Sequence, residues 1–225
     1  MRKIKIVKRV LKSLPMAAVA GFPCIGSPIV KIVDDVFNEQ ARERVELFQN
    51  EMLDKYSKLD KSFEDKIRNY SNFASLIGTV RKDACLDIEA NKVKIYVSAT
   101  INALKNESFT DVKTHMLLNL LRDFTTLHIE ILKILKIIDD TMDLKNQRYD
   151  YILDYLKNNY KEKNVIESDF KYILSDLEKK NCCFLIESPI MYDDEDKTDS
   201  SDNIVTLLGR EFLEFISSQE EANAN

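Results

Sequence analysis

Histidine and cysteine are the reactive residue types in this chain of 225 residues, and both are few. The two histidines are His115 and His128. Neither stands in a His-x-x-x-His or Cys-x-x-Cys pattern of the kind that binds zinc. His128 lies among Leu127, Ile129 and Leu132, which favours a position on a helix surface or core edge over a metal-ligand role.

The four cysteines are scattered, with one adjacent pair: Cys24, Cys85, Cys182 and Cys183. This spacing does not resemble a disulfide framework and favours a reducing cytoplasm. The adjacent pair stands at the start of a β-prone run, where cysteines most simply act as small hydrophobic residues. The four glycines form no phosphate-binding loop. We therefore expect no enzyme, and no catalytic, cofactor-binding or metal-binding residues.

Acidic residues gather near the C-terminus, in the segment 192–203, which holds six carboxylates and one lysine. Four of its side chains offer oxygens to a calcium ion: Asp194, Asp196, Thr198 and Asp202. The segment lacks the central glycine and the final glutamate of an EF-hand loop, so a solvated loop is the simpler interpretation. The whole chain has a formal charge of only −5, which conceals this local excess.

Basic residues gather at the opposite end, where residues 1–13 contain six of them and no acid. If this leader is helical, one face is apolar and the other carries the charged side chains Arg2, Lys5, Lys8, Arg9 and Lys12. Such a helix can lie on anionic lipid. It can equally pack against the rest of the protein, or bind an acidic partner or the chain's own acidic end. These alternatives stay open, and a position at the inner face of the membrane is one of them.

The elements between these ends are predicted to be helices. Only one glycine and no proline occur between Ile29 and Ser188, and apolar residues recur at helical spacing. A long amphipathic helix is predicted from about Ile29 to Lys58, and four shorter helices follow up to Ile138. We expect the apolar stripe of the long helix to need a partner surface, in a homodimer or in a complex with another protein.

The C-terminal third contains sequence motifs in a recognisable order. A helix ending in Leu177-Glu-Lys-Lys180 leads into the β-prone run Cys182-Cys-Phe-Leu-Ile186, and the acidic segment is followed by Thr206-Leu-Leu-Gly-Arg-Glu-Phe-Leu213. From about Thr125 to Ser218, this order resembles the winged helices of MarR-type regulators. The resemblance implies a helical module with a small β-hairpin, and Thr206 is expected to cap the closing helix. Asn181 stands where that family has a glycine turn.

The predicted fold is therefore mainly α: a leader with a Pro/Gly-rich segment at 1–28, a helical region at 29–124, a winged-helix-like module at 125–218 and a disordered tail at 219–225. The whole chain is also similar to small uncharacterised bacterial helical proteins, loosely associated with accessory or defence loci. A winged helix that reads DNA presents basic and amide side chains in the major groove and a basic wing to phosphate. Here the candidate lysines are Lys171, Lys179 and Lys180, and acidic residues offset them.

Three functions follow from these patterns. The leading hypothesis is a non-enzymatic protein that acts through protein contacts, because the acidic wing would repel phosphate. The alternatives are a DNA-binding regulator and an effector that acts on membranes through its basic leader.

Overall fold

The computed structural model describes residues 28–58, 72–87, 89–106, 109–141, 148–161, 165–185 and 203–217. Within these ranges the chain forms eight helices and no β-strand, which confirms the mainly helical fold. The chain divides into two compact units. The first comprises residues 1–123 and 215–225, and the second comprises residues 124–214. The predicted leader up to residue 27, with all six of its basic residues, and the tail at 219–225 lie outside the described residues.

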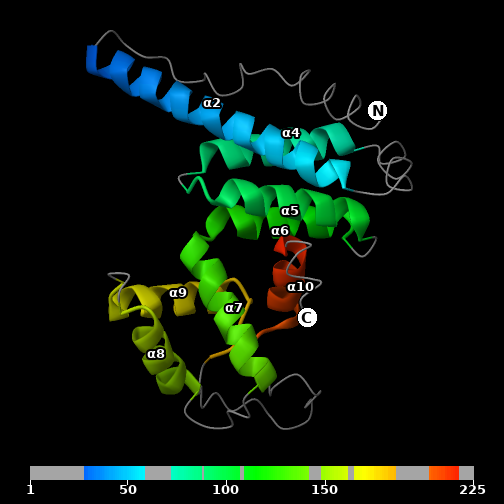
Figure 1. Cartoon of the computed structure of the whole chain (residues 1–225). Coiled ribbons are helices and arrows are strands. Elements are labelled where there is room, and N and C mark those ends of the chain that lie inside the picture. The colour runs from blue at the N-terminus through cyan, green and yellow to red at the C-terminus, as the bar shows by residue number, and fades with distance from the viewer. Residues whose placement is uncertain are drawn as a thin grey trace. The chain divides into compact units, whose positions relative to one another are not determined.

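The first unit contains α2 (Pro28–Ser57), α4 (Phe73–Leu86), α5 (Lys92–Lys105) and α6 (Asp111–Asp123). The bounds of α2 confirm the predicted long helix. This helix contacts both α4 and α5, which also contact each other (Figure 1). Its buried face is one stripe at helical spacing: Ala41, Val45, Phe48, Met52 and Tyr56.

Helices of the same chain thus provide the cover that the stripe on α2 needs. The expectation that this stripe requires a partner surface is wrong for residues 41–56. The periodicity identified the buried face correctly, but a period carries no information about what buries it.

A buried polar cluster fixes the connection between α4 and α5. Lys92 is only 2% exposed, and its Nζ lies 2.5 Å from Oδ2 of Asp87 and 5.7 Å from the ring centroid of Tyr96. The hydroxyl of Tyr96 donates to the same carboxylate at 3.3 Å. Burial, and then the charge of Asp87, raise the pKa of Tyr96. From α2, Arg44 donates to the backbone carbonyls of Cys85 and Asp87. The buried ammonium is thus paired, as a buried charge must be.

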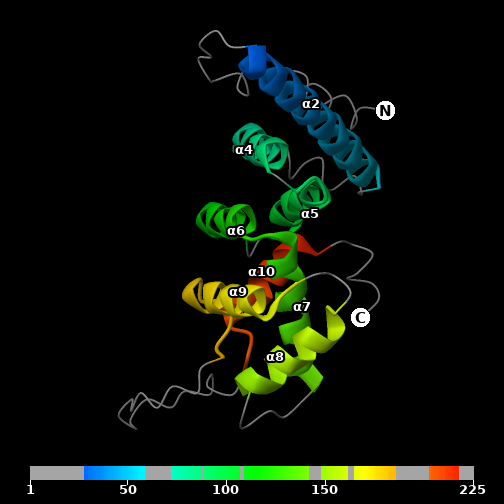
Figure 2. The same cartoon turned by 90° about the vertical axis from the view of Figure 1, so that its left-hand side faces the viewer.

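The second unit contains α7 (Thr126–Thr141), α8 (Arg148–Asn159), α9 (Glu167–Lys179) and most of α10 (Leu207–Ile216). Helix α9 contacts both α7 and α8 (Figure 2). Each of these helices contributes large apolar side chains to the core, including Ile131, Leu135, Ile152, Leu156, Phe170, Leu174 and Phe212. Thr206 caps α10, as predicted, because its Oγ1 accepts a hydrogen bond from the backbone N–H of Gly209 at 3.0 Å.

The predicted β-hairpin is represented in the described residues by one antiparallel bridge, between Cys183 and Val205. Two hydrogen bonds flank it: Phe184 N–H donates to the carbonyl of Ile204 at 2.8 Å, and Thr206 N–H donates to that of Cys182 at 3.2 Å. Residues 186–202, which include all of the acidic segment 192–203 except Asn203, lie outside the described residues, so the hairpin itself stays a prediction.

Side-chain carboxylates accept hydrogen bonds from those backbone N–H groups of the two segments that do not bond across the bridge. Glu178 accepts from the backbone N–H of Leu185 at 2.7 Å. Asp139 accepts from the backbone N–H groups of Ile204 at 2.7 Å and Val205 at 3.1 Å. The amides of residues 184–185 and 204–206 are therefore all bonded.

Asn181 takes the place of the glycine expected after α9. Its φ of 57° is the left-handed conformation. Asn181 N–H donates to the carbonyl of Glu178 at 2.8 Å, and Cys182 N–H donates to that of Leu177 at 2.9 Å. These two bonds form a Schellman motif, and asparagine tolerates the left-handed position better than other non-glycine residues. The end of α9 is thus closed by a left-handed residue that is not a glycine.

None of the helices in the described ranges combines the length and apolar content that crossing a bilayer requires.

Candidate interaction surface

The three candidate lysines of the DNA-binding alternative all lie at or near α9, but not on one face. A helix turns by about 100° per residue, so Lys171 and Lys180 are separated by about 180° around the axis. Lys179 and Lys171 differ by about 80°. Lys179 is exposed, whereas Lys180 is half-buried at the C-cap. The structure therefore does not gather these ammonium groups into a single phosphate-binding row.

Lys171 is also committed to a neighbouring acid. Its Nζ lies 2.6 Å from Glu167 Oε1, while Lys157 Nζ from α8 lies 2.8 Å from Oε2 of the same carboxylate. The hydrogen bonds from Lys157 and Lys171 lower the pKa of Glu167 to about 2. This arrangement joins the start of α9 to α8 and partly neutralises both ammonium groups.

The outward face of α9 includes the exposed Lys171 and, beside it, a stripe of five residues that we call the α9 stripe: Ser168, Tyr172, Ser175, Asp176 and Lys179. These positions fall within about 100° of one another around the helix. Tyr172 is its largest side chain and is 67% exposed. The stripe carries one acid and one base, and it has no arginine, asparagine or glutamine.

A buried histidine supports the stripe from below. His128 is 5% exposed, its ring stacks on Phe124 at 5.4 Å, and the Tyr172 ring meets it edge-to-face at 6.5 Å. Asp176 Oδ2 lies 3.6 Å from His128 Nε2. The predicted position at a helix surface or core edge thus corresponds to a buried ring directly beneath Tyr172.

His128 also caps the start of α7. The backbone N–H of Thr125 donates to His128 Nδ1 at 3.2 Å, and the backbone N–H of His128 donates to Thr125 Oγ1 at 3.3 Å. This reciprocal pair is a capping box in which histidine takes the usual role of glutamate. Nδ1 of His128 is bonded to Thr125, which positions the ring beneath the aromatic side chain of Tyr172.

The sequence did contain a signal for Tyr172. The buried residues of α9 are Phe170, Ile173, Leu174 and Leu177. Their periodicity leaves position 172 on the opposite side of the helix. An aromatic residue on the solvent side of an amphipathic helix is a recognisable candidate for an interaction surface, because aromatic residues are enriched at the centre of protein interfaces.

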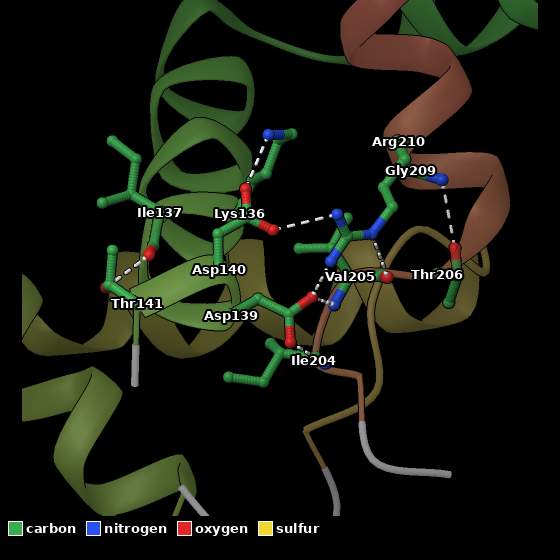
Figure 3. Close-up of polar contacts among 10 residues, drawn as sticks. All are labelled: Lys136, Ile137, Asp139, Asp140, Thr141, Ile204, Val205, Thr206, Gly209 and Arg210. Carbon is green, nitrogen blue, oxygen red and sulfur yellow. Dashed lines mark hydrogen bonds and ion pairs between the residues drawn. The ribbon is translucent and has the colours of Figure 1, made fainter. Parts of the chain in front are cut away.

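A polar clamp holds the chain where it returns from the acidic segment (Figure 3). Its centre is Asp139 in the last turn of α7, whose side chain is only 4% exposed. Besides the amides of Ile204 and Val205, its Oδ2 accepts from Arg210 Nη2 of α10 at 2.5 Å. The clamp therefore joins the C-terminal end of α7, the chain entering the bridge and the start of α10.

Asp140 extends the clamp toward solvent. It accepts from Lys136 at 2.7 Å and from Arg210 Nη1 at 3.0 Å (Figure 3). The hydrogen bond from Lys136, and then that from Arg210, lower the pKa of Asp140. Burial lowers the pKa of Arg210, but the hydrogen bonds from Arg210 to Asp140 and Asp139 outweigh this effect, so the pKa is raised.

The position of this aspartate pair gives a sequence signal that was missed. Two acids at a helix C-terminus oppose the helix dipole, so their presence there indicates cationic or N–H partners elsewhere in the chain.

The adjacent cysteines lie in the core of the second unit, as their interpretation as small hydrophobic residues predicts. Cys182 and Cys183 are both fully buried. Burial, with the charge of Asp176, raises the pKa of Cys182 to about 12, and burial raises that of Cys183. A thiol with a raised pKa is a poor nucleophile, so these groups are suited to packing.

Metal-ligand clusters were not expected from the sequence. Across the part of the chain that the structure describes, no group of three or more histidine, cysteine, aspartate or glutamate side chains is arranged to hold a metal ion. No family model, curated protein or solved structure matches this chain.

Proposed function

We propose that the second unit is a winged-helix-like module that acts through contacts with another protein, without catalysis and in the cytoplasm. The order of its elements supports this proposal. Three helices, α7, α8 and α9, precede the bridge between Cys183 and Val205, and α10 follows it. This is the order of elements in a winged helix, with α9 in the position of the reading helix.

The observation that carries the proposal is the composition of the α9 stripe. A helix that reads bases presents arginine, lysine, asparagine or glutamine to the major groove. Of these types the stripe has only Lys179, with Asp176 one turn away, and the neighbouring Lys171 is paired with Glu167. A large exposed aromatic residue, Tyr172, occupies its centre. This composition is more typical of a protein interface than of a base-reading helix.

The charge of the unit points the same way. The sequence from 124 to 214 contains 12 lysines and arginines against 20 aspartates and glutamates. Release of counterions from phosphate drives most nonspecific DNA binding and requires a cationic surface. An acidic unit lacks this contribution, and electrostatic complementarity favours a basic protein partner.

A DNA-binding regulator remains the second candidate function, because the order of elements and the exposed lysines Lys171 and Lys179 of α9 favour it. A salt-titrated binding assay separates the two. Under the protein-contact proposal, the full chain leaves the migration of duplex DNA unchanged at about 0.05 M salt. Retardation that falls steeply with salt, and that is lost when Lys171, Lys179 and Lys180 are replaced by alanine, would support the regulator and refute the proposal.

The membrane hypothesis depends on residues outside the described ranges and needs its own arm of the same assay. Cosedimentation with vesicles that contain anionic lipid, but not with neutral vesicles, is the expected behaviour of a membrane-acting leader. Deletion of residues 1–14 then abolishes it. If the full chain does not sediment with anionic vesicles, the membrane hypothesis is rejected.

Homodimerisation remains a separate hypothesis, and residues 41–56 of α2 do not support it, because they are buried within the chain. Analytical ultracentrifugation of the full chain at micromolar concentration tests it. A single monomeric species would reject the homodimer and leave a different protein as the partner.

A further inference from the structure

We propose that Tyr172 and Asp176 of α9 together form a binding site for an arginine side chain on a basic segment of the partner protein. The inference rests on the proposed protein-contact function and specifies the partner's chemistry. The occupant is an arginine-containing polypeptide segment.

The first element of this site is the ring of Tyr172. With 67% of the residue exposed, the ring is accessible to a partner. Its edge-to-face contact with the buried His128 fixes the ring from one side. Because His128 is itself held by Thr125, the ring is supported by a rigid residue and not by a mobile side chain. An exposed aromatic face attracts a guanidinium group by cation–π interaction and by stacking.

The second element is the carboxylate of Asp176. It lies four residues after Tyr172, so the two side chains are neighbours on the same face of the helix. Its side chain is 24% exposed, and Oδ2 is 3.6 Å from His128 Nε2. The same histidine therefore lies beside both the ring and the carboxylate. A partly buried carboxylate attracts a cation more strongly than a fully exposed one, because solvent screens it less.

Arginine fits these two groups better than lysine does. Its planar guanidinium can stack on a ring while its N–H groups bond to a carboxylate. A lysine ammonium is compact and more strongly hydrated, and it lacks a plane to stack. The excess of acids in residues 124–214 attracts a basic segment over a longer range and assists its association.

Lys179 is the residue that distinguishes this site from a DNA-binding surface. It lies on the same stripe, three residues after Asp176, so its positive charge opposes an incoming arginine. Replacement of Lys179 by alanine should therefore tighten the binding of an arginine peptide. The same substitution should weaken the binding of DNA, because it removes a phosphate contact. The two hypotheses thus predict opposite signs for one variant.

The experiment measures the binding of two peptides to the full chain by fluorescence anisotropy. One peptide alternates arginine with glycine, and the other replaces every arginine by lysine. We expect the wild-type chain to prefer the arginine peptide by about threefold or more. Tyr172→Ala should reduce that preference to near unity, whereas Tyr172→Phe keeps the ring and should retain it. Asp176→Asn should weaken the binding of the arginine peptide by about three- to fivefold.

The matched control is Tyr151→Ala, since Tyr151 is a partly exposed tyrosine on α8 of the same unit. It should leave the preference unchanged. Circular dichroism confirms that each variant is folded, and Tyr172→Phe together with Asp176→Asn tests the site even if Tyr172→Ala does not fold.

Equal binding of the two peptides, failure of both to bind, or an arginine preference that survives Tyr172→Ala would each overturn the binding site. None of these results bears on whether the unit binds DNA. Retardation of duplex DNA that Lys179→Ala weakens would instead overturn the proposed function.

Discussion

Replacement of Asp139 by alanine should be among the most destabilising single changes in the second unit. The side chain is 4% exposed and serves three donors: the backbone N–H groups of Ile204 and Val205 and the guanidinium of Arg210. Alanine leaves these donors without their acceptor. An unsatisfied buried N–H costs about 1–3 kcal/mol. Arg210 is 33% exposed and keeps Asp140, so its loss is smaller. The free energy of unfolding should fall by about 3–5 kcal/mol.

Asp140→Ala is the matched control for this substitution. Asp140 precedes the same helix end and bonds to the same arginine, but its side chain is 39% exposed. Exposed ion pairs typically contribute less than about 1 kcal/mol. The free energy of unfolding of Asp139→Asn should lie between those of the two alanine variants. The asparagine amide keeps one acceptor oxygen but directs an NH₂ group at a donor. The three substitutions differ little in size, so their order reports the hydrogen bonds.

Urea denaturation followed by circular dichroism measures these differences. Since the chain has two units, the transition of residues 124–214 must be identified separately. Hydrogen exchange at the amides of Ile204 and Val205 does so, because those amides should lose protection in Asp139→Ala and keep it in Asp140→Ala. If the two alanine variants differ by less than about 1 kcal/mol at equal m-value, the clamp does not stabilise the unit as its geometry implies.

Four further measurements test other parts of the second unit. Gly209→Ala should cost about 2 kcal/mol or more in urea denaturation, because a Cβ there would lie 2.9 Å from Val205 Cγ1 and closer still to the carbonyl oxygen of Cys182. Asn181→Gly should raise the free energy of unfolding by about 0.5–1 kcal/mol, since glycine adopts the left-handed φ of 57° without strain. At pH 8 the thiol of Cys182 should react with an alkylating reagent only after denaturant is added, as its pKa of about 12 and its burial imply; rapid labelling of the folded chain would contradict this. The carboxyl of Glu167 should titrate near pH 2 by NMR; because this pKa lies below its ordinary value of 4.5, the associated stabilisation is complete above about pH 5 and is lost as the pH falls through 2.

Local patterns in the sequence predicted the helices well, because helix bounds depend on nearby residues. Thr206 is an example: a threonine three residues before a glycine N–H and directly before an apolar run marks a helix start, and the structure has the cap there. The apolar period of α2 likewise predicted its buried face over residues 41–56. These features need no knowledge of the rest of the chain.

Contacts between distant segments were not predictable in this way. Asp139 lies 65 residues before Ile204 in the sequence, and no local pattern names that partner. The stripe on α2 was assigned to a partner protein for the same reason, although α4 and α5 cover it. Tyr172 is uncharged, so a count of charges along α9 does not identify it, although the apolar period places it on the exposed side.

The carboxylates that cap the outer amides of the bridge have a consequence for the behaviour of the chain in concentrated solution. A β-prone run such as Cys182–Leu185 next to open amides can add a strand from another molecule and start a fibril. Here Glu178 and Asp139 occupy those amides with groups that cannot continue a ladder. They also place negative charge where a second strand would have to approach. The backbone N–H groups of Leu185 and Val205 are thus closed to a strand from a second molecule.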